Sequence, residues 1–233
     1  MSKYKVSMNT TFWGPDGWIL LHSIAYTYPE NPKKSDREKY NGFYKILPKI
    51  LPCKYCRSSL IEFYNELPLA PALVSRDLLT KWIYDIHNKV NEKLRCQGFL
   101  DKPDPSFASV NRSYKDLPFN KNNGLVGKLF IYSTVYNFPY IAIKYPTVKT
   151  LLSRFIKHLG NVYPDCRLQN GLDKNIFKIA DNTKKQLKCL IRLDCLFRKS
   201  DNINQDSKME YDVVKVLLEN NKVKQCKQTC RKL

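Results

Sequence analysis

The sequence is poor in the residues and motifs on which several common protein classes depend. Only 8 of its 233 residues are glycine, which excludes collagen-like and glycine-rich repeats. Neither G-x-G-x-x-G nor G-x-x-x-x-G-K-[ST] occurs, so a Rossmann or P-loop nucleotide site is not expected. No apolar run approaches the roughly 18 residues that suggest a membrane-spanning helix. Residues 1–10 lack the apolar stretch of a secretory signal. We therefore expect a cytosolic protein without a membrane span.

Acidic residues are also scarce relative to basic ones. The chain has 40 Lys and Arg against 21 Asp and Glu, which gives a formal charge of +19 and a pI near 9.5. Such a balance suits nucleic acid, an anionic membrane or acidic proteins as partners. We favour solvated lysine faces as the explanation, and nucleic-acid binding is not expected. Hydrophobic residues make up 43% of the chain, which is enough for a core.

The apolar spacing in the first part of the chain is that of helices. It predicts helices over 13–29, 35–50, 52–66 and 75–94, with no clear strand among them. Ser35 and Glu38 have the S-x-x-E spacing of a capping box for the second of these helices. The expected class is therefore all-α, with a bundle of four or five helices at the start.

Loop-forming residues between 98 and 123 indicate a domain boundary. We divide the chain into a first domain, 1–118, and a second, mostly helical domain, 119–233. In the second domain the pattern predicts helices over 148–159, 184–197 and 212–218, with a polar linker over 199–209. At a constant offset of 110, L-L-H-S-I-A-Y-T-Y-P at 20–29 lies on F-I-Y-S-T-V-Y-N-F-P at 130–139. The second domain is thus either a degenerate copy of the first or an unrelated helical extension.

Cys53-Lys-Tyr-Cys56 is a C-x-x-C pair at the start of a predicted helix. A helix N-terminus favours a thiolate, because unpaired N–H groups and the helix dipole point there. The pair is therefore a candidate redox centre. Two alternatives remain open at this point, namely half of a zinc site and two inert buried cysteines. The zinc alternative describes a basic, zinc-stabilised nucleic-acid-binding protein with Cys53 and Cys56 as ligands.

Two of the three histidines follow tryptophans at close to helical spacing. His22 follows Trp18 at i+4, and His87 follows Trp82 at i+5. A single histidine on an apolar helix is usually a core residue, but this repeated pairing accompanies the C-x-x-C motif. These rings are of the kind that sandwich a planar aromatic cofactor and bond to its polar edges.

Four motifs in a fixed order carry a resemblance to a known family. They are W-G-x-x-G-W-x-x-L-H-S at 13–23, Y-P-x-x-P at 28–32, L-P-C-x-x-C at 51–56 and W-x-x-x-x-H-N-x-V-N-x-K-L at 82–94. Together they resemble the Erv/ALR family of FAD-linked sulfhydryl oxidases, over the first half of the chain only. The Asn- and Lys-rich composition is similar to that of versions carried by large cytoplasmic DNA viruses, which implies the host cytoplasm or the virion as its location.

The resemblance implies an enzyme that forms disulfide bonds in protein dithiols and passes electrons through FAD to molecular oxygen, giving hydrogen peroxide. It also implies a homodimer. Cys53 and Cys56 would be catalytic, with Cys56 against the flavin and Cys53 facing outward; no metal is implied. The remaining FAD-binding positions that it implies are Gly14, Trp18, His22, Tyr26, Trp82, His87, Asn88, Val90, Asn91, Lys93 and Leu94.

The chain departs from the family pattern in two places. Pro15 stands where the family often has an arginine that contacts phosphate, and no cysteine lies between Cys56 and Cys96, so a second structural pair is absent. Family members often relay electrons through a shuttle disulfide, for which Cys226 and Cys230 in the basic tail are the candidates. Structural roles are expected for the remaining cysteines, Cys96, Cys166, Cys189 and Cys195.

Overall fold

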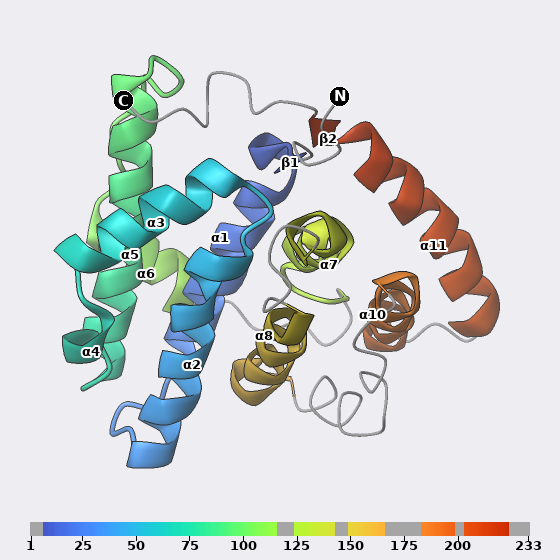
Figure 1. The fold of residues 1–233 in the computed structure, drawn as a ribbon. Coiled ribbons are helices and arrows are strands. Elements are labelled where there is room, and N and C mark those ends of the chain that lie inside the picture. Colours follow the sequence, from blue (N-terminus) through green and yellow to red (C-terminus); the bar gives the residue numbers. More distant parts are fainter. Residues whose placement is uncertain (1–6, 116–123, 143–148, 166–182, 199–202, 224–233) are drawn as a thin grey trace.

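The computed structural model describes residues 7–115, 124–142, 149–165, 183–198 and 203–223 (Figure 1). These residues are mainly helical, which confirms the all-α class, and their one sheet pairs β1 (Ser7–Met8) with β2 (Lys222–Val223). The helices of the first half are α1 (Thr10–Tyr26), α2 (Lys34–Ile50), α3 (Lys54–Glu66), α4 (Leu69–Ala72), α5 (Arg76–Cys96) and α6 (Phe107–Lys115). Those of the second half are α7 (Lys128–Ala142), α8 (Lys149–Val162), α10 (Thr183–Phe197) and α11 (Ile203–Asn220).

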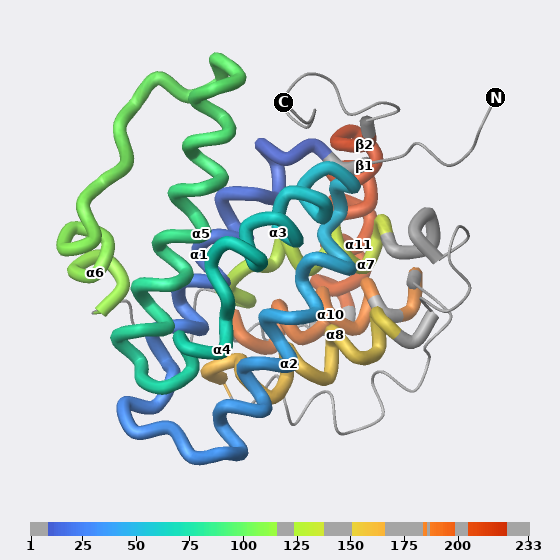
Figure 2. The backbone as a smooth tube through the Cα atoms, turned by 60° about the vertical axis from the view of Figure 1, so that its left-hand side comes forward, coloured from blue at the N-terminus to red at the C-terminus, as the bar shows by residue number. Residues whose placement is uncertain are grey.

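Helix α6 lies within a region expected to be loop. Its apolar residues are supported by tertiary contacts, because the ring of Phe107 packs 5.3 Å from that of Tyr84, whose hydroxyl donates to Pro105 O at 2.8 Å. Figure 2 shows α6 at the outer edge of the molecule, beside α5 and α1. The prediction of a loop from composition is therefore wrong here, because contacts with α5 stabilise a helix in this segment.

Two other local expectations are wrong. Helix α11 already begins at Ile203, within the segment expected to be a linker, and the ion pair between Arg198 and Glu210 at 2.9 Å ties it to α10. At the start of α2 the capping side chain is that of Asp36, which accepts from Lys33 N at 3.0 Å. The expected box of Ser35 and Glu38 fails because the N-cap is Lys33, two residues before Ser35.

The core of the first half is built from large aromatic side chains whose polar atoms are satisfied. Tyr44 is fully buried, and its hydroxyl donates to Leu21 O at 2.9 Å. The indole of Trp82 packs edge-on against Tyr44 at 5.3 Å, and its Nε1 donates to Leu67 O at 2.9 Å. These hydrogen bonds and ring contacts fix α1, α2, α3 and α5 relative to one another. They also satisfy polar groups that would be costly to bury without a partner.

The two halves pack through corresponding helices, α1 against α7 and α2 against α8 (Figure 1). A Cβ added at Gly17 would lie 3.2 Å from Phe130, and a Cβ added at Gly127 would lie 2.6 Å from Leu20. These two contacts are reciprocal, since adding 110 to 17 and to 20 gives 127 and 130. A contact that runs both ways in this manner is typical of two units related by a two-fold axis.

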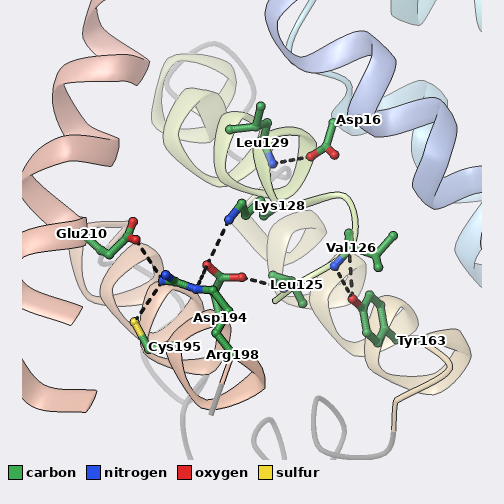
Figure 3. Close-up of polar contacts among 10 residues, drawn as sticks. All are labelled: Asp16, Leu125, Val126, Lys128, Leu129, Tyr163, Asp194, Cys195, Arg198 and Glu210. Atoms are coloured by element: carbon green, nitrogen blue, oxygen red, sulfur yellow. Dashed lines mark hydrogen bonds and ion pairs between the residues drawn. The ribbon is translucent and has the colours of Figure 1, made fainter. Parts of the chain in front are cut away.

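A carboxylate of the first half also binds the beginning of α7 (Figure 3). Asp16 Oδ2 accepts from the backbone N–H of Leu129 at 2.6 Å. Burial raises the pKa of Asp16 above its usual value, and the hydrogen bonds from α7 oppose that rise. Because unpaired N–H groups and the positive end of the dipole lie at a helix N-terminus, this contact stabilises both the helix and the junction.

Asp194 of α10 joins the helices of the second half (Figure 3). Its carboxylate is 2% exposed and accepts from Leu125 N at 2.6 Å. It also lies 3.3 Å from Lys128 Nζ and 3.3 Å from Arg198 Nε. The buried charge is therefore paired on two sides and fixes α10 against the start of α7.

Candidate functional site

The C-x-x-C pair lies at the N-terminus of α3. Cys53 is the N-cap residue, and its Sγ accepts from the backbone N of Cys56 at 3.3 Å. This confirms the expected placement at a helix start, where N–H groups stabilise a thiolate. The side chain of Cys53 is fully buried, whereas that of Cys56 is half-buried. The expectation that Cys53 faces outward is therefore wrong, because its sulfur turns back to cap its own helix.

The turn that carries Cys53 is held by side chains from both halves of the protein. Arg57, one turn into α3, donates from Nη1 to Leu51 O at 2.5 Å. Asn137 of α7 donates from Nδ2 to Pro52 O at 3.0 Å, in a buried hydrogen bond. Both carbonyls before Cys53 thus accept from a side chain. The second half of the chain therefore contacts the turn that carries the redox pair.

A cluster of aromatic rings joins α1 and α5. The rings of Trp18 and His87 stack with centroids 3.9 Å apart and planes 11° apart. His22 Nε2 lies 3.1 Å from His87 Nδ1, in a hydrogen bond. The structure thus brings together three residues that the sequence identified in two separate motifs.

Burial keeps both histidines of this cluster neutral. It lowers the pKa of His22 to about 3, with a further decrease from the nearby His87. It lowers the pKa of His87 to about 4, which the charge of Asp104 partly opposes. At neutral pH each ring therefore has one N–H donor and one acceptor nitrogen. Such rings suit the polar edge of a heterocycle better than an isolated anion.

Two polar atoms of the cluster have no partner among the described residues. They are His22 Nδ1 and the hydroxyl oxygen of Tyr26, and both are buried. Burial also raises the pKa of Tyr26 to about 12. Because buried polar groups are usually hydrogen-bonded, these two atoms are available to bind a ligand at this position.

Tyr114 of α6 belongs to the same cluster and was missed in the sequence. Its ring stacks on that of His22 at 4.8 Å and on that of Tyr26 at 5.6 Å. The spacing of Phe107, Val110 and Tyr114, at i, i+3 and i+7, would have revealed the helix that carries it. A tyrosine in a segment taken as loop gave no other signal.

Asp104, also missed, fixes two side chains of α5. It accepts from Asn91 Nδ2 at 2.7 Å and forms an ion pair with Arg95 at 2.7 Å. The ion pair with Arg95 lowers the pKa of Asp104. Asn91, expected to bind cofactor, is therefore held in place by a carboxylate that precedes α6.

Lys93 connects the cysteine-bearing helix to the histidine-bearing helix. Its Nζ donates to Ser59 Oγ at 2.6 Å, and Ser59 lies three residues after Cys56. Both residues line a groove of about 400 Å³ between α3 and α5, together with Glu62, Phe63, Glu66, Lys89, Glu92 and Cys96. Lys93 thus joins the helix that carries the redox pair to the helix that carries His87, in a groove whose lining includes both basic and acidic side chains.

The other residues expected to bind the cofactor differ in their position relative to the ring cluster and in their exposure. Trp82 does not join the cluster, because its ring packs in the core against Tyr44 and Tyr64. A Cβ added at Gly14 would meet no atom within 4 Å, so space is open there. Three further positions on α5 are all partly exposed, namely Asn88, Val90 and Leu94.

The described residues do not support the zinc alternative. Among them, no group of three or more His, Cys, Asp and Glu side chains is arranged to hold a metal ion. Cys96, Cys189 and Cys195 are free cysteines, and they are exposed, half-buried and buried in that order. Cys166, Cys226 and Cys230 lie outside the described residues. No helix in the described ranges has the length and apolar character to cross a membrane.

Comparison with known proteins agrees with the order of the motifs. Residues 15–112 match the model of the Erv1 / Alr family. A probable FAD-linked sulfhydryl oxidase of Acanthamoeba polyphaga mimivirus is 40% identical over 85 residues, which are 36% of this chain and 59% of that protein. The mitochondrial FAD-linked sulfhydryl oxidase of Saccharomyces cerevisiae is 38% identical over 86 residues, 37% of this chain and 44% of that protein. A relative from Invertebrate iridescent virus 3 is 27% identical over 115 residues, 49% of this chain and 73% of that protein.

The first two matches thus span about half the length of those relatives (59% and 44%). The match to the family model ends at residue 112, so the model does not cover the second half of this chain.

Proposed function

Because residues 15–112 are an Erv1/Alr family domain, we propose that the protein is an FAD-dependent sulfhydryl oxidase that forms disulfide bonds in client proteins. One observation carries the proposal. A C-x-x-C pair caps α3, and the bond from Lys93 to Ser59 joins that helix to α5, which carries His87. A redox pair and a cluster of neutral aromatic rings therefore occupy adjoining helices. The names of the relatives, all FAD-linked sulfhydryl oxidases, support the same activity.

The residues of the cluster fit a flavin nucleotide. The unpaired His22 Nδ1 and Tyr26 hydroxyl supply hydrogen-bonding atoms for a heterocycle, and the open space at Gly14 leaves room for one. Trp18, His87 and Tyr114 supply ring faces for stacking. The remaining proposed contacts are Asn88, Val90, Asn91, Lys93 and Leu94 from α5, Cys56 from α3 and Trp82. Of these, Trp82 has the least support, because its Nε1 donates to Leu67 O.

The two cysteines would perform the thiol chemistry. A client thiolate attacks Cys53 Sγ in the Cys53–Cys56 disulfide, and Cys56 leaves as a thiolate. A second client thiol then displaces Cys53, so the client gains a disulfide and the pair becomes a dithiol. When bound, FAD would accept the two electrons of that dithiol and pass them to molecular oxygen, giving hydrogen peroxide. The N–H of Cys56 that binds Cys53 Sγ stabilises the reduced pair.

Purified protein tests this function. It should be yellow, with a flavin absorption band, and should consume oxygen in the presence of dithiothreitol. Cys53→Ser and Cys56→Ser should each abolish oxygen uptake and keep the flavin, whereas Cys189→Ser, which changes a half-buried cysteine of the second half, should retain both. Colourless protein with stoichiometric zinc would instead support the metal-binding alternative.

We further propose that Cys226 and Cys230 form a shuttle disulfide that passes oxidising equivalents to clients. The described chain before them supports this role. β2 pairs with β1, and Lys222 Nζ lies 4.8 Å from the ring centroid of Tyr136, next to the residue that binds Pro52. Cys226 follows Val223 by three residues, an extended reach of about 10 Å. Oxidation of protein thiols that survives truncation after Lys222 would remove this assignment.

We propose that residues 1–118 form the oxidase domain and that residues 119–233 form a degenerate copy of it. The reciprocal contacts of Gly17 with Phe130 and of Gly127 with Leu20 support a duplication. At the offset of 110, His22 corresponds to Tyr132, which is buried. The second half has therefore kept the face that packs on the first half, but it lacks the imidazole that His22 supplies to the proposed cofactor site.

We also propose that two copies of the protein associate, as the resemblance implies. The faces of α1 and α2 that pack on α7 and α8 are already covered within one chain, so the contact between copies would lie elsewhere. Light scattering after gel filtration measures the mass of the assembly directly.

The viral relatives support action in the host cytoplasm or in the virion.

A further inference from the structure

The second half of the protein contacts the turn before Cys53 through a buried hydrogen bond. Asn137, on α7, is 2% exposed and donates to the carbonyl oxygen of Pro52, the residue directly before Cys53. The two residues are 85 positions apart in the chain. This bond therefore couples the position of Cys53 to a domain that has lost the cofactor chemistry.

The bond acts on a turn that decides whether Cys53 can react. Leu51, Pro52 and Cys53 are all buried, and a buried thiol is inaccessible to a client until its turn opens. The Leu51 carbonyl is held by Arg57, which moves with α3. Asn137 binds the carbonyl oxygen of Pro52 and belongs to α7, in the second half of the chain. The bond therefore resists any movement of the turn away from α7.

The amide of Asn137 also has an acceptor atom, Oδ1, which is buried and has no hydrogen-bond partner among the described residues. An unpaired buried acceptor is costly unless a group can use it. Among the described contacts, the buried amide is therefore used through its Nδ2, which binds Pro52 O.

We propose that Asn137 is a positioning residue for the Cys53–Cys56 pair, through which the second half sets the exposure and the reduction potential of Cys53. The inference rests on the proposed function in one respect, since it takes Cys53 and Cys56 as the reacting pair. When Asn137 releases Pro52, the turn opens and Cys53 Sγ moves away from the N–H of Cys56. The reduced pair then loses a stabilising contact, and the thiol becomes accessible.

The test uses the full-length protein with the pair and any bound flavin reduced and with oxygen excluded throughout, so that the pair stays a dithiol during labelling and reaches equilibrium with glutathione. Asn137→Leu keeps the number and the branching of the side-chain heavy atoms and removes both polar atoms, and Asn137→Asp removes the amide donor. Thr134→Val is the matched control, because Thr134 is a buried residue one turn earlier on α7 whose hydroxyl has no partner. Cys195, which is fully buried in α10, is an internal reference for general loosening of the fold.

The first measurement is the rate at which N-ethylmaleimide labels Cys53, followed by peptide mass spectrometry. Losing one buried hydrogen bond should favour the open turn about fivefold, so Cys53 in both Asn137 variants should react about fivefold faster. Labelling of Cys195 should stay at the wild-type rate, and Thr134→Val should behave like the wild type. Equal Cys53 rates in wild type and both variants would overturn the proposal. A parallel rise at Cys195 would overturn it too, because it would show general loosening.

The second measurement is the fraction of Cys53–Cys56 disulfide at equilibrium with glutathione buffers. In the oxidised state two glutathione thiols reduce the pair and become glutathione disulfide, so the balance reports the potential of the pair. We expect the equilibrium constant for reduction of the pair by glutathione to be about fivefold lower in the Asn137 variants. Their midpoint should therefore lie in a more reducing buffer. An unchanged midpoint would show that Asn137 has no effect on the couple. Neither measurement depends on oxygen uptake, so a failure of the oxidase proposal would be seen separately, as absent flavin or absent turnover in the wild type.

Discussion

Acid should destabilise this protein through its buried histidines, and His22 allows the effect to be isolated. The pKa of His22 is lowered to about 3 in the folded protein by burial, while an unfolded histidine has a pKa of about 6.5. Below that value the unfolded chain binds a proton that the folded chain does not. The free energy of unfolding therefore falls as the pH falls from about 6.5 toward about 3.

The size of the effect follows from the two pKa values. Between about pH 7.5 and about pH 5, His22 alone should lower the free energy of unfolding by about 2 kcal/mol. His87, with a pKa of about 4, adds a comparable loss over the same interval. Carboxylates titrate mostly below this interval, so the histidines dominate the change within it.

Urea denaturation of the cofactor-free protein at the two pH values measures this loss. His22→Gln replaces the ring with a polar side chain that does not titrate, so the variant should lose about 2 kcal/mol less than the wild type between the two pH values. The comparison uses the pH-dependent difference within each protein, so a uniform loss of stability from the substitution cancels. If His22→Gln and wild type lose stability equally on acidification, then His22 is not held neutral by burial.

Two further predictions concern the contacts between and within the halves. Gly127→Ala should lower the free energy of unfolding by about 2–4 kcal/mol, because φ is +78° there and the new Cβ would lie 2.6 Å from Leu20. Gly98→Ala, with φ of +70° and nothing within 4 Å, should cost only about 1 kcal/mol; equal losses in urea denaturation would contradict the packing argument. Asp194→Asn should cost about 1–3 kcal/mol, because it removes the buried charge between two cations. Asp85→Asn, in a surface ion pair, should change stability by less than about 1 kcal/mol, and a comparable melting shift in both variants would refute the special role of Asp194.

Features encoded by local spacing were predictable from the sequence. Trp18 and His22 share a helix face at i+4, and the motif at 82–94 places His87 on another helix, so their meeting follows from amphipathic packing. Ser75 as the start of α5 follows from its side chain, which accepts from Leu78 N at 3.3 Å. Such features depend on residues within a turn or two of one another.

Features that depend on distant contacts were not predictable. The burial of Cys53 accompanies a bond between Asn137 and Pro52, 85 positions apart. Tyr114 reaches His22 only because α6 packs back onto the first half. Trp82 has the same motif signature as a cofactor residue, yet core packing decides its place. Local sequence patterns do not encode these contacts between residues that are far apart in the chain.

The mutual insertion of Leu20 and Phe130 at the facing glycines has a consequence for dilute solution. Two separate subunits joined by such a face would part as their concentration fell below the dissociation constant. Here a covalent tether keeps the opposing surface at an effective concentration that dilution leaves unchanged. The interface between the two halves should therefore persist at any protein concentration, because each chain contains both of its surfaces.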